Sequence, residues 1–220
     1  MSWTVVIPVR RAPAAKTRLG PDIADAGRAE LARAFALDTI EAALAARTVG
    51  RVIVVGDDPS LAGSAEFLPE PTSPDRGLDV AIRHGIARAQ IVPVGPADAA
   101  GGPSPVRVAV LLGDLPALRP DELDLALDAA ARHPLSFISD ADGAGTTFAA
   151  ATVGGFEPRF GAASAERHAG AGFVELDASA LPGITHDVDT VDALETALHL
   201  GVGVHTAEAV ARLADRKDAS

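Results

Sequence analysis

The chain has 220 residues, which is long enough for one sizeable α/β domain. It contains no cysteine, which excludes a disulfide framework and thiol chemistry. The formal net charge of −11 disfavours nucleic acid as a partner, because an acidic surface repels phosphates. No apolar run approaches the roughly 20 residues of a membrane span. The first apolar run is short and is followed by Arg10 and Arg11, the reverse of the order in a signal peptide. We therefore expect a soluble cytoplasmic protein without a membrane partner.

Short β-branched segments alternate with segments of helical periodicity, which predicts a mainly parallel sheet flanked by helices. The predicted strands are residues 4–9, 52–55, 65–69, 108–112, 135–139, 146–153 and 173–176. The predicted helices are residues 25–47, 78–90, 121–133, 162–170 and two final segments separated near 201–203. We expect a single domain over residues 1–215. Within it, residues 92–105 are expected to form a flexible surface insertion, and residues 216–220 a frayed tail.

The predicted central strand ends in Gly113 and Asp114, and Pro116 prevents it from continuing. Its four apolar residues before Gly113 indicate burial on both faces. Ligands of open α/β sheets bind at the carboxyl ends of the strands. Asp114 is therefore a candidate site residue, and the alternative is a turn residue that caps the next helix.

A basic loop follows the first strand. Residues 1–21 contain no Asp or Glu, yet they hold Arg10, Arg11, Lys16 and Arg18. This position is where many α/β proteins bind nucleotide phosphates, and small residues let backbone amides approach an anion. The alternative is a solvated basic loop. Neither the Walker A motif nor the Rossmann GxGxxG motif is present.

A carboxylate pair precedes the last helical region. Asp187 and Asp189 flank Val188, so an extended backbone places both carboxylates on the same side. Together with Asp114 they offer the oxygen ligands that magnesium prefers. The alternative is that Asp189 or Thr190 caps the final helix.

Two further segments carry polar groups near glycines. In SDADGAGTT, the Asp140 and Asp142 pair could bind a metal or form a turn. Thr146 and Thr147 follow, with hydroxyls and amides at a strand start. In FGAASAERH, Gly161 and Ser164 offer amides and a hydroxyl to an anion at a predicted helix start. Ser164 and His168 lie on one helical face. A Ser-His hydrolase is disfavoured because no GxSxG motif is present, and a lone His168 is more often structural.

Six segments, from Thr4 to about Leu200, together resemble one known family. They are PVRRAPAAKTRL, GLDVAIRHG, LLGDLPAL, SDADGAGTT, FGAASAERH and DVDTVDAL. They are similar to the guanylyltransferases that act on phosphoenolpyruvate or 2-phospho-L-lactate in biosynthesis of the deazaflavin coenzyme F-420. The resemblance implies a GT-A-like, Rossmann-like nucleotidyltransferase fold, with a mixed, mainly parallel seven-stranded sheet, one antiparallel strand and flanking helices.

The resemblance also implies the reaction and its residues. GMP would pass from GTP to a phosphorylated three-carbon acid, with release of pyrophosphate. Lys16 and Arg18 would hold the triphosphate and act in catalysis with Asp114. The remaining implied residues are Arg10, Gly77 and Asp79 for the nucleotide, Thr146, Gly161 and Ser164 for the acceptor, and Asp114, Asp187 and Asp189 for Mg²⁺.

The residues leave several alternatives open. We expect phosphoenolpyruvate as the acceptor, because the Ala- and Arg-rich composition suggests a bacterial source and bacterial relatives favour it. Phospholactate and 3-phosphoglycerate remain alternatives, and a later transferase of the pathway is a candidate partner. Other classes are a sugar or molybdopterin nucleotidyltransferase, a GT-A glycosyltransferase using Asp140 and Asp142, and a non-catalytic nucleotide-binding module.

Overall fold

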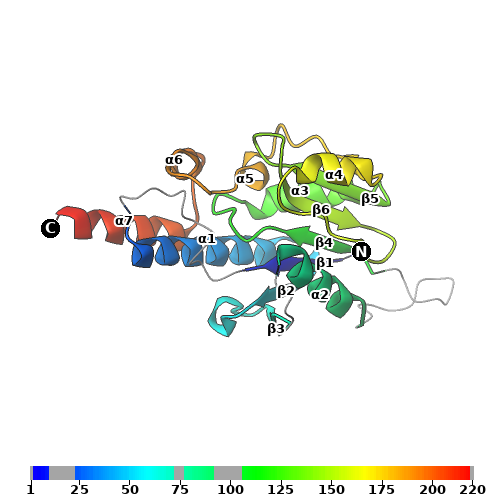
Figure 1. Cartoon of the computed structure of the whole chain (residues 1–220), viewed down its shortest axis with the longest axis horizontal. Helices are drawn as coiled ribbons and strands as arrows, with labels where there is room; N and C mark the ends of the chain where they lie inside the picture. The colour runs from blue at the N-terminus through cyan, green and yellow to red at the C-terminus, as the bar shows by residue number, and fades with distance from the viewer. Residues whose placement is uncertain (1, 10–22, 72–76, 92–105, 219–220) are drawn as a thin grey trace.

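The computed structural model describes residues 2–9, 23–71, 77–91 and 106–218 (Figure 1). Its seven strands form one sheet in the order β3-β2-β1-β4-β6-β5-β7. They are β1 (Trp3–Pro8), β2 (Val49–Gly56), β3 (Glu66–Pro69), β4 (Val108–Leu111), β5 (Leu135–Ser139), β6 (Thr146–Ala151) and β7 (Val174–Glu175). β6 is antiparallel to β4 and β5, and the other neighbouring strands are parallel. The predicted mixed, mainly parallel seven-stranded sheet is confirmed.

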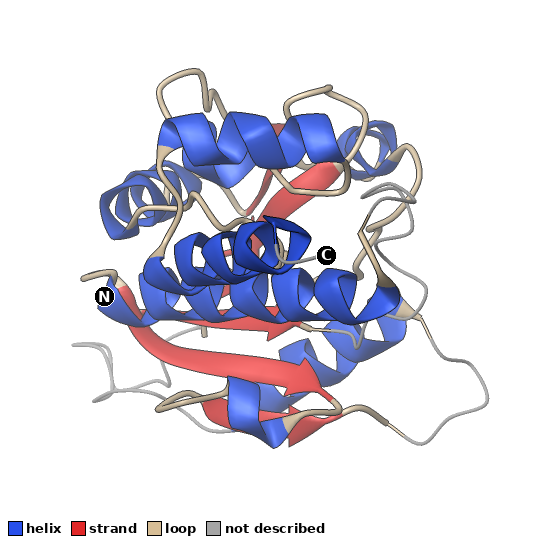
Figure 2. Ribbon diagram, turned by 90° about the vertical axis from the view of Figure 1, so that its left-hand side faces the viewer, coloured by secondary structure: helices blue, strands red, loops and turns tan. Residues whose placement is uncertain are grey.

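Helices cover both faces of the sheet (Figure 2). On one face lie α1 (Asp25–Ala45), α3 (Pro120–Ala130) and α5 (Pro182–Thr185), which pack against Val5 and Ile7 of β1 and their neighbours. On the other face lie α2 (Leu78–Ile91) and α4 (Ser164–Gly170), in the cluster that contains Val6. β4 is therefore apolar at all its positions, as is typical of a strand buried on both faces.

Close packing of α2 depends on a glycine. A Cβ atom built on Gly85 would lie 2.3 Å from Cγ1 of Val6 and 2.9 Å from Cγ2 of Val55. Side chains of β1 and β2 therefore occupy the space that a larger residue would need. The absence of a side chain at Gly85 lets the helix approach the sheet.

A third cluster joins the end of the chain to α1. It contains Leu31 and Phe35 of α1, together with residues of α6 (Val191–Leu200) and α7 (Val204–Asp218). The buried Asp38 of α1 caps α7, because its carboxylate accepts hydrogen bonds from the amides of His205 (3.0 Å) and Thr206 (2.9 Å). As a result α7 lies alongside α1 (Figure 1).

Some helices were not predicted from the sequence, and some elements begin or end at other residues than expected. A short 3-10 helix (Pro59–Leu61) and α5 were not predicted, and β2 begins at Val49 rather than Val52. α7 extends to Asp218, within the segment 216–220 where we expected a frayed tail. Arg216 there forms an ion pair with Glu30 of α1.

Two predicted features lie outside the described residues. They are the basic loop, with Arg10, Lys16 and Arg18, and the insertion at residues 92–105. Within the ranges that the structure describes, no helix combines the length and the apolar character needed to cross a membrane.

Candidate active site

A cavity of about 580 Å³ lies at one edge of the sheet. β1 and β4 end at this edge, and β6 begins there because it runs in the opposite direction. The cavity is lined by Pro8, Val9, Ala32, Leu78, Leu112, Gly113, Asp114, Asp140, Ala144, Gly145, Thr146, Thr147, Gly161, Ala162, Ala163, Ser164, Asp187 and Asp189. Six predicted site residues are thus brought together: Asp114, Thr146, Gly161, Ser164, Asp187 and Asp189.

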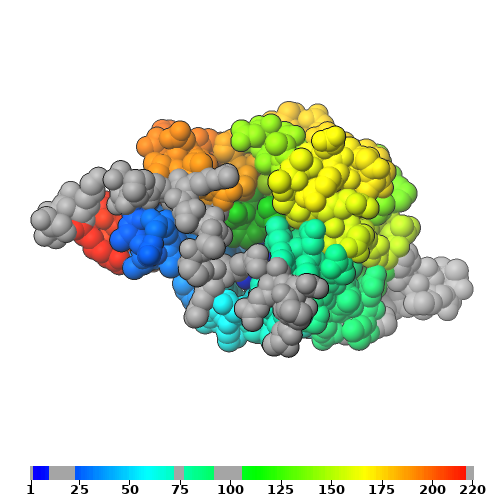
Figure 3. Space-filling model, in the orientation of Figure 1, coloured from blue at the N-terminus to red at the C-terminus, as the bar shows by residue number. Residues whose placement is uncertain are grey.

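Two segments distant in sequence lie next to each other on the outer surface near this edge. Figure 3 shows the residues of α4 and the stretch before it, in yellow, beside those of α2, in green. An ion pair between Arg83 of α2 and Glu157 connects them. The pKa of the Glu157 carboxyl is lowered, chiefly by its hydrogen bond with Arg83.

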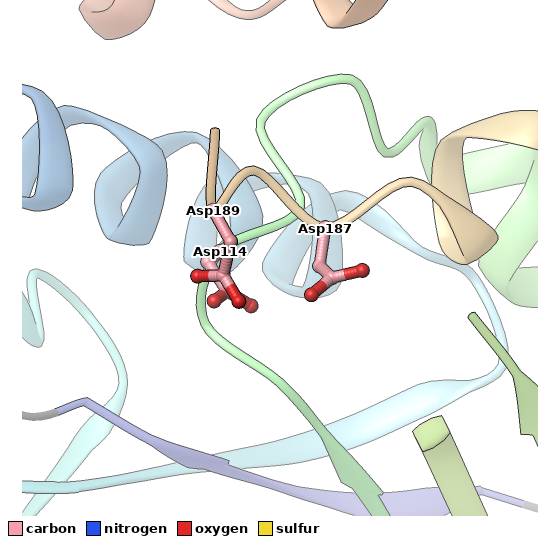
Figure 4. A group of neighbouring side chains, drawn as sticks. All are labelled: Asp114, Asp187 and Asp189. Atoms are coloured by element: carbon pink, nitrogen blue, oxygen red, sulfur yellow. The ribbon is translucent and has the colours of Figure 1, made fainter. Parts of the chain in front are cut away.

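Asp114, Asp187 and Asp189 form a carboxylate cluster within the cavity. One carboxylate oxygen of each lies within 4.8 Å of those of the others, and all three residues are half-buried. Figure 4 shows the carboxylate groups of Asp114 and Asp189 close together, with that of Asp187 beside them. The amide of Val188 donates to the carbonyl oxygen of Asp114 at 3.0 Å, which ties the two segments together.

The alternation of side chains along an extended backbone explains how residues 187–189 present two carboxylates. Val188 is fully buried in the cluster with Leu31 and Phe35, so its neighbours Asp187 and Asp189 face the cavity instead. Capping does not account for these carboxylates. The hydroxyl of Thr190 caps α6 through the amide of Ala193 (3.1 Å), which agrees with one of the two capping alternatives. α3 begins only at Pro120, with Arg119 as its N-cap, so Asp114 is not its cap.

The spacing of the three carboxylates suits a small divalent cation. Octahedral Mg²⁺ binds oxygens at about 2.1 Å, which places its ligand oxygens roughly 3 to 4 Å apart. The cluster meets this spacing with small side-chain movements, since its oxygens lie within 4.8 Å. Three half-buried carboxylates also repel one another, and a cation would offset that cost.

Asp140 forms a turn rather than a cation site. Its carboxylate accepts hydrogen bonds from the amides of Ala144 (2.9 Å) and Gly145 (2.8 Å), which closes the loop between β5 and β6. Asp142 is exposed and lies outside the carboxylate cluster. Of the two alternatives for this pair, the turn is the one that the structure contains.

Two buried hydroxyls in the cavity wall have no hydrogen-bond partner among the described residues. They are Oγ of Ser164 and Oγ1 of Thr147, on residues 1% exposed each. Since a buried hydroxyl without a partner costs about 1–3 kcal/mol, both are suited to bind a polar ligand. Thr147 was noted in the sequence only as a second hydroxyl beside Thr146, and its burial could not be predicted.

The expectation of free amides before α4 is partly wrong. The amide of Ser164 donates to the carbonyl oxygen of Gly161 (3.1 Å) and that of Ala165 to Ala144 (3.2 Å), because the chain folds back on itself here. Gly161 has a φ of +100°, and Ala163 adopts a left-handed conformation with a φ of +51°. Left-handed backbone in a non-glycine residue costs roughly 1 kcal/mol, so the surrounding contacts hold this loop in place.

His168 lies behind the cavity wall, fully buried. Its Nδ1 is 2.9 Å from the carbonyl oxygen of Ser164 and 3.1 Å from Oγ1 of Thr146. Burial, together with the nearby cations Arg167 and Arg159, lowers the pKa of His168 to about 4. The ring is therefore neutral at physiological pH.

The predicted nucleotide residues at the start of α2 support the cavity from outside its lining. Asp79 accepts a hydrogen bond from the amide of Phe160 (3.0 Å), and burial raises the pKa of its carboxyl. The carbonyl oxygen of Gly77 accepts from the amides of Val80 and Ala81, which begins the helix. Leu78 between them, part of the same stretch that the resemblance assigns to the nucleotide pocket, lines the cavity.

Some known proteins are similar to this chain in sequence, and others are similar to it in fold. A family model described as "Guanylyl transferase CofC like" matches residues 3–213. A phosphoenolpyruvate guanylyltransferase from Streptomyces scabiei (strain 87.22) is 48% identical, over 97% of this chain and 98% of the relative. One from Geodermatophilus obscurus is 44% identical, over 94% and 93%. A crystal structure from Desulfovibrio desulfuricans G20, described among the nucleotide-diphospho-sugar transferases, has a TM-score of 0.59 at 18% identity, covering 89% of this chain and 86% of that one. This last similarity concerns the fold alone.

Proposed function

The chain belongs to the CofC-like guanylyl transferase family, as its motifs indicated, and from this we propose that it transfers GMP from GTP to phosphoenolpyruvate. The reaction releases pyrophosphate and serves the biosynthesis of coenzyme F-420. The observation that carries the proposal is the convergence, in one cavity, of three carboxylates with two buried hydroxyls that have no hydrogen-bond partner in the part of the chain that the structure describes. The names of the relatives support phosphoenolpyruvate as the acceptor.

The chemistry requires alignment more than proton transfer. A phosphate oxygen of the acceptor is already an anion, so it attacks the α-phosphorus of GTP without a protein nucleophile or a strong base. One P–O bond forms to the acceptor, and the bond to pyrophosphate breaks. Positioning and charge stabilisation then supply the rate. This agrees with a chain that has no cysteine and with a neutral His168 set behind the wall.

Asp114, Asp187 and Asp189 would hold magnesium. Bound there, the ion would offset the charge that develops on the α-phosphate during attack. The half-buried position of the carboxylates keeps the charge effective, because screening by water is weaker than at an open surface. Lys16 and Arg18 remain the proposed ligands of the triphosphate and Arg10 a further nucleotide ligand; all three lie outside the described residues. Gly77 and Asp79 are proposed to shape the nucleotide side of the site.

The acceptor is proposed to bind against Thr146, Gly161 and Ser164. The hydroxyls of Ser164 and of Thr147 would donate to its anionic oxygens, which gives both the partner they lack among the described residues. The product holds a new phosphoanhydride, so a later transferase of the pathway would be the protein that consumes it.

Two other classes are less well supported. A GT-A glycosyltransferase would need Asp140 and Asp142 at a cation, yet the carboxylate of Asp140 holds the turn. A non-catalytic nucleotide-binding module gives no reason for three carboxylates packed within 4.8 Å.

The test is pyrophosphate release from GTP, with magnesium, against phosphoenolpyruvate, 2-phospho-L-lactate and 3-phosphoglycerate. We expect the highest kcat/KM with phosphoenolpyruvate. A clearly higher value for phospholactate would overturn the acceptor while leaving the guanylyl transfer intact. Release with none of the acceptors, together with sugar transfer from a nucleotide sugar, would favour the glycosyltransferase.

A further inference from the structure

We infer, on the basis of the proposed function, that His168 is a positioning residue that joins the two acceptor-binding segments. Its Nδ1 lies within hydrogen-bond distance of Thr146 in β6 and of Ser164 in α4. Both neighbours are proposed acceptor residues, and His168 itself lies outside the lining of the cavity. Its role would therefore be to fix the distance between the two segments.

The partners of His168 define the state of its ring. A carbonyl oxygen can only accept, so the 2.9 Å contact with the carbonyl of Ser164 requires a proton on Nδ1. Oγ1 of Thr146, at 3.1 Å from the same nitrogen, shares that proton as a second acceptor. In the neutral ring Nε2 then carries no proton, and it is buried without a partner among the described residues.

Aromatic rings hold this orientation. The ring of Phe137 stacks on His168 at a centroid distance of 5.7 Å. Phe160 and Phe173 meet it edge-on at 5.1 and 4.9 Å. A turned ring would lose both contacts of Nδ1, so the hydrogen bonds favour the orientation in which the three rings pack.

An irregularity in β6 makes the contact with Thr146. Ile138 pairs with Phe148, but the next residue, Ser139, pairs with Thr146, so Thr147 is skipped. In a regular strand Thr146 would share the face of Phe148, which packs in the cluster of α1 and α3. The bulge turns Thr146 instead toward His168 on the opposite face, as bulges often do beside active sites.

A space-filling role alone does not explain a histidine here. An apolar ring would fill the aromatic pocket without leaving Nε2 buried and unpaired, which costs about 1–3 kcal/mol. The hydrogen bonds of Nδ1 are the feature that phenylalanine lacks. They order Thr146 and Ser164 relative to each other before the acceptor binds.

The test uses variants that place a nitrogen at different positions. In His168→Asn the amide nitrogen reaches the place of Nδ1, in His168→Gln it reaches that of Nε2, and His168→Phe keeps only the ring. We expect the Asn variant to keep the KM for phosphoenolpyruvate within about threefold, since it keeps the bond. The Gln and Phe variants should raise it at least about fivefold, as expected for loss of about one hydrogen bond. The KM for GTP should stay unchanged in all three.

His199→Phe is the matched control. Nδ1 of His199 also contacts the carbonyl oxygen four residues earlier, that of Glu195 (2.7 Å), but on the exposed surface of α6. Its loss should change neither KM. If His168→Phe fails to fold, as thermal unfolding would reveal, the Asn and Gln variants still decide the matter.

A second readout does not depend on turnover. Nitrogen chemical shifts from NMR of the ligand-free protein should show His168 neutral with its proton on Nδ1. A proton on Nε2 would overturn the inference, as would wild-type acceptor KM values in both the Gln and Phe variants. Wild-type protein that releases no pyrophosphate with any acceptor would instead refute the proposed function, and the role of His168 toward the acceptor would fall with it.

Discussion

Replacement of Asp114 by Asn separates a metal-binding role from a structural one. The change removes one charge and keeps the shape of the side chain. Asp114 lies within 4.8 Å of both Asp187 and Asp189, so it takes part in two carboxylate repulsions. At this distance two like charges repel by about 1 kcal/mol in water and by about 3 kcal/mol at an effective dielectric constant near 20.

The loss of this charge should affect stability in opposite directions without and with magnesium. In EDTA the variant should be as stable as the wild type or more stable, because repulsion is relieved; each kcal/mol corresponds to about 2–4 °C in Tm for a protein of this size. With magnesium, the rise in Tm seen for the wild type should be reduced. Turnover should fall about a thousandfold, if the ion contributes about 4 kcal/mol to the transition state.

The assay is pyrophosphate release at saturating magnesium, with thermal unfolding in EDTA and in magnesium. Asp142→Asn is the matched control, since that carboxylate is exposed and lies outside the cluster. This substitution should change neither turnover nor thermal unfolding. A folded Asp114→Asn protein with near-normal turnover would refute the metal assignment. So would a variant that loses about 1 kcal/mol in EDTA and keeps the wild-type response to magnesium.

Three further predictions concern the acceptor wall, a buried histidine and a helix cap. Ser164→Ala should raise the KM for phosphoenolpyruvate by roughly 10- to 150-fold, the value of one hydrogen bond to a charged group. Stability should stay unchanged or rise, because the variant removes a buried hydroxyl that has no partner among the described residues. A rise in the KM for GTP alone would assign Ser164 to the nucleotide. Burial holds the pKa of His168 at about 4, below its ordinary 6.5, so the unfolded chain takes up the proton first as the pH falls. The stability that this difference supplies is complete above about pH 6.5 and is lost as the pH falls toward 4. Denaturant unfolding should therefore show a free energy of unfolding about 1 kcal/mol lower at pH 5.5 than at neutral pH. His168→Asn should not show this decrease. Asp38→Ala removes the acceptor for the amides of His205 and Thr206 and should lower the free energy of unfolding by about 1–3 kcal/mol, measured in urea; an unchanged midpoint would mean that α7 is held by its apolar contacts alone.

Most of the fold could be predicted from the sequence because its strands are short apolar runs and its helices have clear periodicity. β4 shows the reason, since its four residues are all buried and the turn at Gly113 follows directly. α5 could not be predicted, because four residues containing Pro182 and Gly183 show no period. The start of β2 at Val49 depends on pairing with Trp3, which only the tertiary structure defines.

The carboxylate cluster could be predicted for a similar reason. The spacing of Asp187 and Asp189 already determines that both face one side, and strand order brings Asp114 to the same edge. The bulge at Thr146 could not be predicted, because it depends on which residue Ser139 pairs with. For Asp140 the sequence offered a turn as one of two alternatives, and the choice between them depends on backbone amides whose positions follow from loop conformation. The hydrogen bond of Asp79 with Phe160 could not be predicted for the same reason.

The direction of β6 divides the candidate active site between separate stretches of chain. The carboxylates follow β4 or precede α6, whereas the hydroxyl of Thr147 follows the turn that Asp140 closes. That turn has an exposed Asp142 and a left-handed Gly143 with open space around it. The turn also contacts the segment that carries two of the carboxylates, because the amide of Ala141 donates to the carbonyl oxygen of Thr185 at 2.9 Å, two residues before Asp187. An exchange of residues in this hairpin would therefore act on the proposed acceptor side and on the carboxylate side of the cavity together.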